Sequence, residues 1–286
     1  YPWDFEVLQA RLPELQSLQC DLKVASLSPL KDSSDIGPLD WTQFAVFLSD
    51  QYAHYDGFVV LHGSDTMSYT ASVMSFMLQR LSKPVIFTGS QLPIGDMRTD
   101  AKENLITSIE LASLKEEGIP IINELAIYFE YKLYRANRTT KMNADNFEAF
   151  WSPNYPILAE AGVRLQVFKD RLLPRSHFPF ELFRTLDQNV SILKIYPGIT
   201  AQHILTFSKI NHLKAIILET YGAGNVPSDS SFLNALEKLI ASGVFVINIT
   251  QCMGGEVTMG HYKSSEALLE MGVVSGKDMT TEAALA

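Results

Sequence analysis

The sequence contains few cysteines and few positive charges. Cys20 and Cys252 are too few for the disulfide framework of a small secreted domain, and they fit a reducing compartment. Only 23 basic residues stand against 32 acidic ones, which gives a formal net charge of −9. Such a balance argues against nucleic acid or an anionic membrane surface as the main partner.

Several motifs of common functions are also missing. No apolar run is long enough to cross a bilayer, so we expect no membrane partner. The six histidines are scattered without metal-ligand spacing, and the glycine-rich loops lack the strand-to-helix setting of a dinucleotide site. We therefore expect neither a metal nor a cofactor. No G-x-S-x-G elbow is present, which removes the usual serine-hydrolase arrangement.

The residues that are present predict a two-domain α/β protein. With 286 residues, of which 47% are hydrophobic, the chain can build two cores. Strand and helix patterns alternate, which predicts right-handed crossovers and mostly parallel, doubly wound sheets. The pattern loosens where prolines and mixed charge accumulate. We expect a larger N-terminal parallel-sheet domain over 1–165, a linker over 166–190 and a smaller C-terminal α/β domain over 191–286.

Apolar periodicity places the expected elements along the chain. Expected helices cover residues 5–18, 41–51, 100–114, 201–209, 229–241 and 264–271. Expected strands cover residues 22–28, 58–61, 125–129, 191–195, 214–219 and 244–249, and a further strand lies near Val85. Because the sequence starts at Tyr1 without methionine and stops within an apolar-periodic stretch, we expect further residues at both ends, including a first strand.

One stretch combines a buried strand with polar chemistry. The apolar run 58–61 is typical of a strand buried on both faces, and a helical pattern follows it. Between them lies the sequence His-Gly-Ser-Asp-Thr over 62–66. Ligands of open α/β sheets bind at such carboxyl ends of strands, beside helix N-termini. The same residues also suit a simple helix cap, and the pattern alone leaves both readings open.

Other polar loops are expected at the same sheet edge. They cover residues 32–35, 88–91 and the segment after the strand 125–129, which contains Lys141. The first loop also suits a plain turn, and on its own the segment with Lys141 is better explained as a solvated basic loop. Ser64, Asp65 and Lys141 would together form a hydroxyl–carboxylate–ammonium set. A lysine beside a carboxylate can help to activate a water or hydroxyl against an amide carbonyl.

These residues resemble a known family. His62–Met67 is similar to the second signature of the bacterial-type L-asparaginases. Further blocks that resemble the family, and most closely its cytoplasmic type I branch, are Asp32–Asp35, Thr88–Gln91, Asn137–Lys141, Tyr221–Asn225 and Thr250–Met253. The resemblance covers nearly the whole chain in the same order. It implies an asparaginase-like fold and a cytoplasmic enzyme that converts L-asparagine to L-aspartate and ammonia, with L-glutamine as a possible weaker substrate.

The resemblance also implies roles for individual residues. Ser64, Asp65 and Lys141 stand at the family's catalytic threonine, aspartate and lysine. Substrate-binding positions implied in the same way are Asp32, Ser33, Ser34, Gly63, Ser64, Asp65 and Ser90. Asn225 would reach the site of a neighbouring subunit, in a homodimer or homotetramer. A zwitterionic amino acid needs both acceptors and donors converging on it, and this set provides them.

The sequence departs from the family pattern in two ways. Position 64 is serine where the family usually has threonine, so the hydroxyl is kept on a less constrained side chain. The first signature, whose threonine is the nucleophile that forms the acyl-enzyme, is absent from the 286 residues, and we expect it upstream of Tyr1. Two alternatives stay open: a non-catalytic sensor of asparagine or aspartate, and a subunit of a larger amidotransferase.

Overall fold

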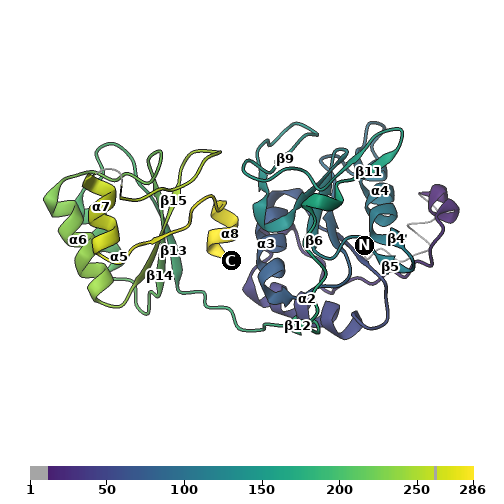
Figure 1. The fold of residues 1–286 in the computed structure, drawn as a ribbon, viewed down its shortest axis with the longest axis horizontal. Coiled ribbons are helices and arrows are strands. Elements are labelled where there is room, and N and C mark those ends of the chain that lie inside the picture. Colours follow the sequence, from purple (N-terminus) through teal and green to yellow (C-terminus); the bar gives the residue numbers. More distant parts are fainter. Residues whose placement is uncertain (1–11, 261–262) are drawn as a thin grey trace. The chain divides into compact units, whose positions relative to one another are not determined.

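The protein, described by a computed structural model over residues 12–260 and 263–286, divides into two compact units. The first ends at Thr185 and the second begins at Leu186 (Figure 1). The expected helix 5–18 lies partly outside the described residues, and its described end is the 3-10 helix η1 (Pro13–Ser17). The expected strand 22–28 is wrong: these residues form no strand and are mostly exposed, because no neighbouring strand pairs with them.

A six-stranded sheet forms the centre of the first unit. Its strands, in spatial order, are β1 (Phe58–Leu61), β3 (Val85–Thr88), β6 (Leu125–Phe129), β7 (Lys132–Arg135), β10 (Ala159–Ala161) and β11 (Leu165–Val167). β1, β3 and β6 are parallel, whereas the next three strands pair antiparallel. The expected parallel sheet is therefore a mixed one, because a tight turn at Glu130 and Tyr131 reverses the chain after β6.

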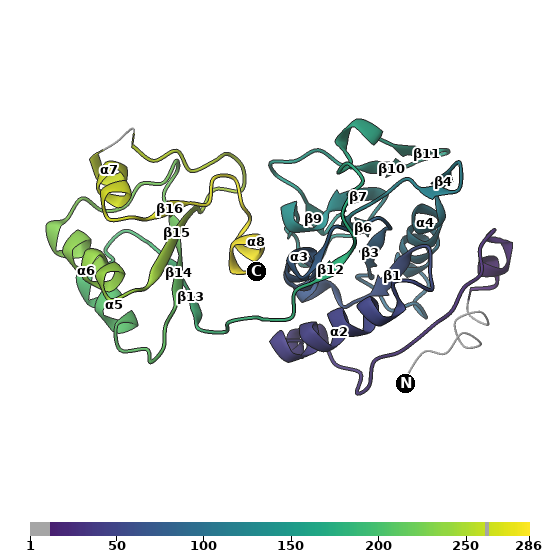
Figure 2. The same cartoon turned by 60° about the horizontal axis from the view of Figure 1, so that its bottom comes forward.

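Helices cover both faces of this sheet, as a doubly wound fold requires. They are α2 (Pro38–Gln51), α3 (Met67–Met77) and α4 (Ala101–Ser113). Figures 1 and 2 show α3 on one face and α4 on the opposite face, with α2 beside α3. The α4 face buries Leu111, Tyr128, Leu133 and Leu158 in one cluster. The described residues contain no helix that is long and apolar enough to cross a membrane.

Short elements complete the first unit. The two-stranded pairs are β2 (Leu78–Gln79) with β12 (Glu181–Leu182), β4 (Lys115–Glu116) with β5 (Ile119–Pro120), and β8 (Thr140–Lys141) with β9 (Phe150–Trp151). The remaining 3-10 helices are η2 (Ser33–Asp35), η3 (Ser64–Thr66), η4 (Ala136–Arg138) and η5 (Lys169–Arg171). β11, η5 and β12 fall within or beside the range expected as a linker, and they pack in the first unit.

The second unit has a four-stranded parallel sheet. Its strands are β13 (Val190–Lys194), β14 (Ala215–Thr220), β15 (Phe245–Thr250) and β16 (Val274–Ser275). Its helices are α5 (Ala201–Phe207), α6 (Ser230–Ala241), α7 (Lys263–Glu270) and α8 (Thr281–Leu285). The first three helices lie on one face of the sheet and α8 lies on the other (Figure 1). This α/β organisation matches the one expected from the sequence.

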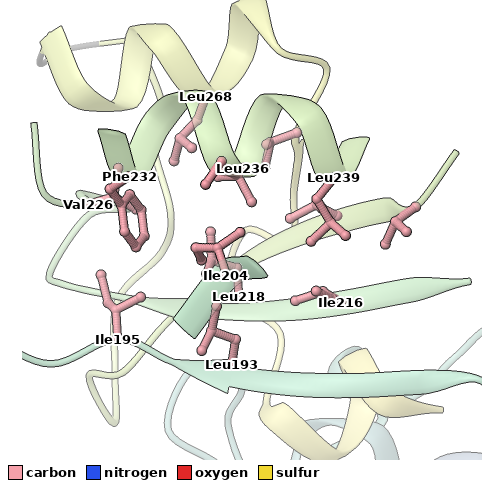
Figure 3. Packing of buried hydrophobic residues seen from close by; sticks show 14 of the residues in the cluster. Leu193, Ile195, Ile204, Ile216, Leu218, Val226, Phe232, Leu236, Leu239 and Leu268 are labelled. Atoms are coloured by element: carbon pink, nitrogen blue, oxygen red, sulfur yellow. The ribbon is translucent and has the colours of Figure 1, made fainter. Parts of the chain in front are cut away.

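α6 shows how the sequence builds this second core. Asp229 caps the helix by accepting a hydrogen bond from the backbone N–H of Phe232, at 2.9 Å. Phe232, Leu236 and Leu239 recur at helical spacing and are almost fully buried. Figure 3 shows these three side chains directed toward the labelled residues of β14. The apolar stripe of the helix therefore covers one face of the sheet.

Candidate active site

Ser64, Asp65 and Lys141 meet at the carboxyl end of β1. The ammonium of Lys141 donates hydrogen bonds to Ser64 Oγ at 2.9 Å and to Asp65 Oδ1 at 2.7 Å. Ser64 and Asp65 lie in η3, directly after β1, and Lys141 ends the short strand β8. Residues 76 or more positions apart in the chain are thus brought into direct contact.

The members of this set differ in their exposure. The Lys141 side chain is 14% exposed, whereas the Asp65 side chain is 72% exposed. The protein therefore shields the lysine from solvent, whereas the carboxylate is open to solvent on one side. An exposed carboxylate beside a largely shielded cation can bind a positively charged group of a small molecule while its other oxygen stays paired.

The loop of Asp32, Ser33 and Ser34 packs directly against η3. Thr66 Oγ1 donates to the carbonyl oxygen of Ser33 at 2.6 Å. Gly63 allows this approach, because a Cβ at position 63 would lie 2.6 Å from Ser33 Oγ and 2.7 Å from its Cβ. Gly63 therefore lets the two loops pack closely, whereas its role in substrate binding stays a prediction.

The Asp32 carboxylate already accepts hydrogen bonds within its own loop. Its Oδ1 accepts hydrogen bonds from the backbone N–H of Ser34 at 2.9 Å and from the Ser34 hydroxyl at 2.7 Å. The backbone bond is the main reason that the pKa of the Asp32 carboxyl lies below its ordinary value. Asp32 therefore stays ionised at neutral pH and adds a second negative charge to this side of the site.

Ser90 follows β3, the strand next to β1. The preceding Gly89 sits so close to His62 that a Cβ would clash with the His62 carbonyl oxygen. Asn104 of α4 holds the same loop by donating to the Gly89 carbonyl oxygen at 3.0 Å. The backbone around Ser90 is therefore fixed beside η3, although no role of Ser90 follows from these contacts alone.

Asn225 belongs to the second unit. Its backbone N–H donates to the carbonyl oxygen of Tyr221 at 2.9 Å, and its own carbonyl accepts from Tyr221 N at 3.0 Å. The buried Asn248 donates to the Gly224 carbonyl oxygen at 3.2 Å. These bonds define a tight loop, and the expected reach of Asn225 into a neighbouring subunit stays a prediction.

The structure adds two residues to which sequence reasoning gave no role. Gln91 accepts a hydrogen bond from Ser64 Oγ at 2.9 Å, and Asp100 accepts from the backbone N–H of Gln91. Gln91 stands at the end of the family-like block 88–91, so its position was visible, but a glutamine beside a strand end has no distinctive chemistry. Within the described residues, no three histidine, cysteine, aspartate or glutamate side chains gather where a metal ion could bind.

Comparisons with known proteins find matches over both units of the chain. Residues 2–173 match the family model "Asparaginase, N-terminal", and residues 189–286 match "Glutaminase/Asparaginase C-terminal domain". The chain is 43% identical over 277 residues to L-asparaginase 1 of Escherichia coli K12, covering 96% of this chain and 80% of that protein. It is 41% identical over 266 residues to the 60 kDa lysophospholipase of Mus musculus, covering 92% of this chain and 46% of that protein.

A solved structure shows the same similarity in three dimensions. L-asparaginase I from Vibrio cholerae superposes with a TM-score of 0.88 at 40% identity, covering 98% of this chain and 83% of that chain. The family models span most of the sequence, and the structural match extends across both α/β units. The resemblance inferred from the signature blocks is thereby confirmed: this chain belongs to the asparaginase family.

Proposed function

We propose that this protein hydrolyses the side-chain amide of L-asparagine to give L-aspartate and ammonia. The observation that carries the proposal is the Lys141 ammonium, bound to both Ser64 Oγ and Asp65 Oδ1 at the carboxyl end of a parallel strand. Membership in the asparaginase family supports the same reaction. The arrangement provides a cation within hydrogen-bonding distance of a hydroxyl and a carboxylate.

Substrate binding follows from the charges of the site. The open carboxylate of Asp65 is suited to accept the α-ammonium group of asparagine, and the ionised Asp32 adds to the negative potential there. Ser33 and Ser34 belong to the loop to which we assign the α-carboxylate. Ser90 follows β3, and we propose that its backbone faces the side-chain amide. Donors fixed in advance stabilise the oxyanion that forms when the amide carbonyl is attacked.

Ser64 and Lys141 serve proton transfer in this proposal. Their 2.9 Å hydrogen bond provides a short path between a hydroxyl and an ammonium group. When the amide C–N bond breaks, the leaving nitrogen must gain a proton, and when water attacks the acyl-enzyme it must lose one. The pair lies where it can relay both protons. The threonine nucleophile expected upstream of Tyr1 stays a prediction.

Substrate preference is proposed to favour asparagine over glutamine. The two substrates differ by one methylene group, and such a difference in a pocket is worth about 1–3 kcal/mol. We therefore expect weaker glutamine turnover by the same residues. Comparing kcat/KM for the two amides under identical conditions measures this preference.

Assembly and location are further parts of the proposal. We infer a homo-oligomer, a dimer or a tetramer, since the role expected for Asn225 needs a second copy of the chain. Both cysteines are free thiols, which supports a reducing, cytoplasmic compartment. Light scattering coupled to size-exclusion chromatography tests the assembly, and cell fractionation tests the location.

The central experiment measures ammonia release from L-asparagine by the purified full-length protein and by its Lys141→Met variant. We expect turnover by the wild type and a loss of at least about 100-fold in kcat in the variant, because the proton path ends without the ammonium. The variant should keep its circular dichroism spectrum, since methionine fills a similar volume.

Lys169→Met is the matched control for this experiment. Lys169 forms an exposed ion pair with Glu116, and its removal should leave turnover unchanged. A wild-type protein that binds asparagine in calorimetry without releasing ammonia would contradict hydrolysis and favour a non-catalytic sensor.

A further inference from the structure

Thr66 stands at the N-cap position of α3, but its hydroxyl does not cap that helix. A threonine at this position usually accepts a hydrogen bond from a backbone N–H in the first turn of the helix. Thr280 of α8 does so, by accepting from the backbone N–H of Ala283 at 3.1 Å. Within the described part of the chain, the Thr66 side chain makes no such capping bond. Its hydroxyl therefore serves another contact.

That contact is with the loop of Asp32, Ser33 and Ser34. Thr66 Oγ1 donates to the carbonyl oxygen of Ser33 at 2.6 Å, across 33 positions of the chain. The same oxygen accepts from the backbone N–H of Ile36 at 3.2 Å, so the threonine is bound to the backbone of η2 itself. A short hydrogen bond thus joins the loop to η3, where the catalytic candidates lie.

Contacts within residues 31–40 give the loop its shape. Lys31 Nζ donates to Asp40 Oδ1 at 2.6 Å, and the backbone N–H of Gly37 donates to Asp40 Oδ2 at 2.9 Å. Because these bonds begin and end within one segment, they do not fix its separation from η3. The Thr66 bond does fix it, because its donor lies in η3 and its acceptor in the loop.

A second contact holds α2, the helix that follows the loop. Trp41 Nε1 donates to Thr70 Oγ1 of α3 at 3.0 Å. Thr70 lies about one helical turn after Thr66. The segment from Ser33 to Trp41 is therefore attached near both of its ends to the start of α3. Removing the Thr66 bond alone should free the loop and leave α2 in place.

The position of Thr66 beside Asp65 gives its bond a consequence for the site. Asp65 and Thr66 are neighbours in η3, so the bond to Ser33 sets the separation between the Asp65 carboxylate and the loop. The α-ammonium and α-carboxylate groups of an amino acid share one carbon atom. The groups that bind them must therefore converge on a small region. We assign the first group to Asp65 and the second to the loop.

We propose that Thr66 is a positioning residue, whose hydroxyl holds the loop of Asp32, Ser33 and Ser34 at the separation from Asp65 that one amino acid requires. The inference rests on the substrate binding proposed above. Thr66 acts through the Ser33 backbone and touches neither the substrate nor Lys141 in this proposal. Its hydroxyl should therefore contribute to binding and not to the chemical step.

Thr66→Val tests this role, because valine keeps the shape of threonine and removes the hydroxyl donor. We expect KM for L-asparagine to rise by about 5- to 10-fold, the scale of one hydrogen bond. kcat should stay unchanged, as it does when binding is lost equally in the ground state and the transition state. Thr66→Ser keeps the hydroxyl and should keep the wild-type KM.

Thr42→Val is the matched control. Thr42 is half-buried like Thr66, and its hydroxyl also donates to a backbone carbonyl oxygen, that of Pro38 at 3.0 Å. This bond lies within α2 and does not reach η3, so Thr42→Val should keep the wild-type KM. An equal rise of KM in both valine variants would overturn the role of Thr66, because loss of any half-buried hydroxyl would then be enough.

Calorimetric titration with L-aspartate separates this proposal from the hydrolysis proposal. We expect Thr66→Val to bind the product about 5- to 10-fold more weakly than the wild type. Thr66→Ala carries the same measurement if the valine variant does not fold. Wild-type affinity and wild-type KM in the variant, or a fall in kcat without a rise in KM, would overturn the positioning role.

The wild type decides which proposal fails. A wild type that binds L-aspartate but releases no ammonia from L-asparagine would contradict hydrolysis alone, and the ratio of the two affinities would still decide the role of Thr66. A wild type that does not bind L-aspartate would overturn both proposals.

Discussion

His62 is a half-buried histidine at the edge of the site, between β1 and Gly63. Its Nδ1 lies 2.7 Å from the Gly63 carbonyl oxygen, which can only accept, so Nδ1 carries the proton. Nε2 is buried and has no partner among the described residues. Burial lowers the pKa of His62, and the bond to Gly63 opposes the shift only in part. The folded protein thus favours the neutral ring.

The lowered pKa predicts acid sensitivity. Below about pH 6.5 the unfolded chain takes up a proton on this histidine while the folded chain resists it. The free energy of unfolding should therefore decrease as the pH is lowered. One such proton contributes a slope of at most about 1.4 kcal/mol per pH unit. Denaturant unfolding between pH 7.5 and 5, a range set about the ordinary histidine pKa, measures the slope.

His62→Phe should flatten this pH dependence, because phenylalanine keeps the contact with Phe87 and cannot titrate. His54→Phe is the matched control, since it makes the same substitution at an exposed histidine. An unchanged slope in His62→Phe would show that other groups cause the acid sensitivity.

At the scale of elements, the hairpin of β6 and β7 explains why the sheet is mixed. Glu130 and Tyr131 form its two-residue turn with φ of 46° and 66°. Turns of this kind normally use Asn-Gly, because positive φ strains other residues. Here the buried Asn104 of α4 accepts a hydrogen bond from the Glu130 backbone N–H at 3.0 Å. The sequence around the turn gave no local signal for it, because the residue that supports the turn lies 26 positions away in α4.

A buried ion pair reinforces the same hairpin. Arg135 at the end of β7 binds Glu124, just before β6, through two hydrogen bonds of 2.5 and 3.2 Å. Glu124 is 2% exposed, and it also accepts from the backbone N–H of Leu173 at 2.7 Å. The pair thus joins the two strands to the segment that follows η5.

Arg135→Met should lower the free energy of unfolding by about 3–5 kcal/mol, because it leaves the buried Glu124 without its counter-charge. The double variant Glu124→Leu, Arg135→Met should lose less free energy of unfolding than Arg135→Met alone, because no unpaired charge is then left buried. Urea unfolding followed by circular dichroism measures both.

The exposed pair Lys169–Glu116 is the comparison, and Lys169→Met should change stability by less than about 1 kcal/mol. Equal losses of stability in Arg135→Met and Lys169→Met would show that burial of the ion pair does not set its contribution.

At the scale of the whole molecule, the role expected for Asn225 predicts subunit complementation. Lys141→Met and Asn225→Ala chains should each have low activity alone. In a two-fold dimer, each mixed pair contains one site with Lys141 and a neighbouring Asn225 both intact, so co-expression should restore about a quarter of wild-type activity. Ammonia release from the purified mixture measures the recovery. Activity no higher than the average of the two parents would place Asn225 outside the neighbouring site.

Much of the architecture could be read from local pattern. The apolar runs at 58–61 and 125–129 and the helical stripe of α6 depend on neighbouring residues, so their periodicity predicts them directly. The candidate residues Ser64, Asp65 and Lys141 were found because polar groups after apolar strands, together with family-like blocks, single them out. The expectation that 58–61 is buried on both faces is wrong, because β1 is an edge strand and Leu61 is 54% exposed. Short strands such as β8 and β10 gave no comparable signal, because two or three residues show no period.

Local sequence therefore determined the main strands and helices and the two-unit organisation, and the resemblance to a family singled out the central catalytic candidates. Tertiary structure decided how those candidates are held. Gln91 meets Ser64 because Asp100 anchors its loop and the carbonyl groups of residues 144 and 146 bind its side-chain amide, and Asn104 supports a turn that the turn's own residues do not favour. These contacts join segments distant in the chain, and a hydrogen bond between such segments forms only when packing brings its donor and acceptor together.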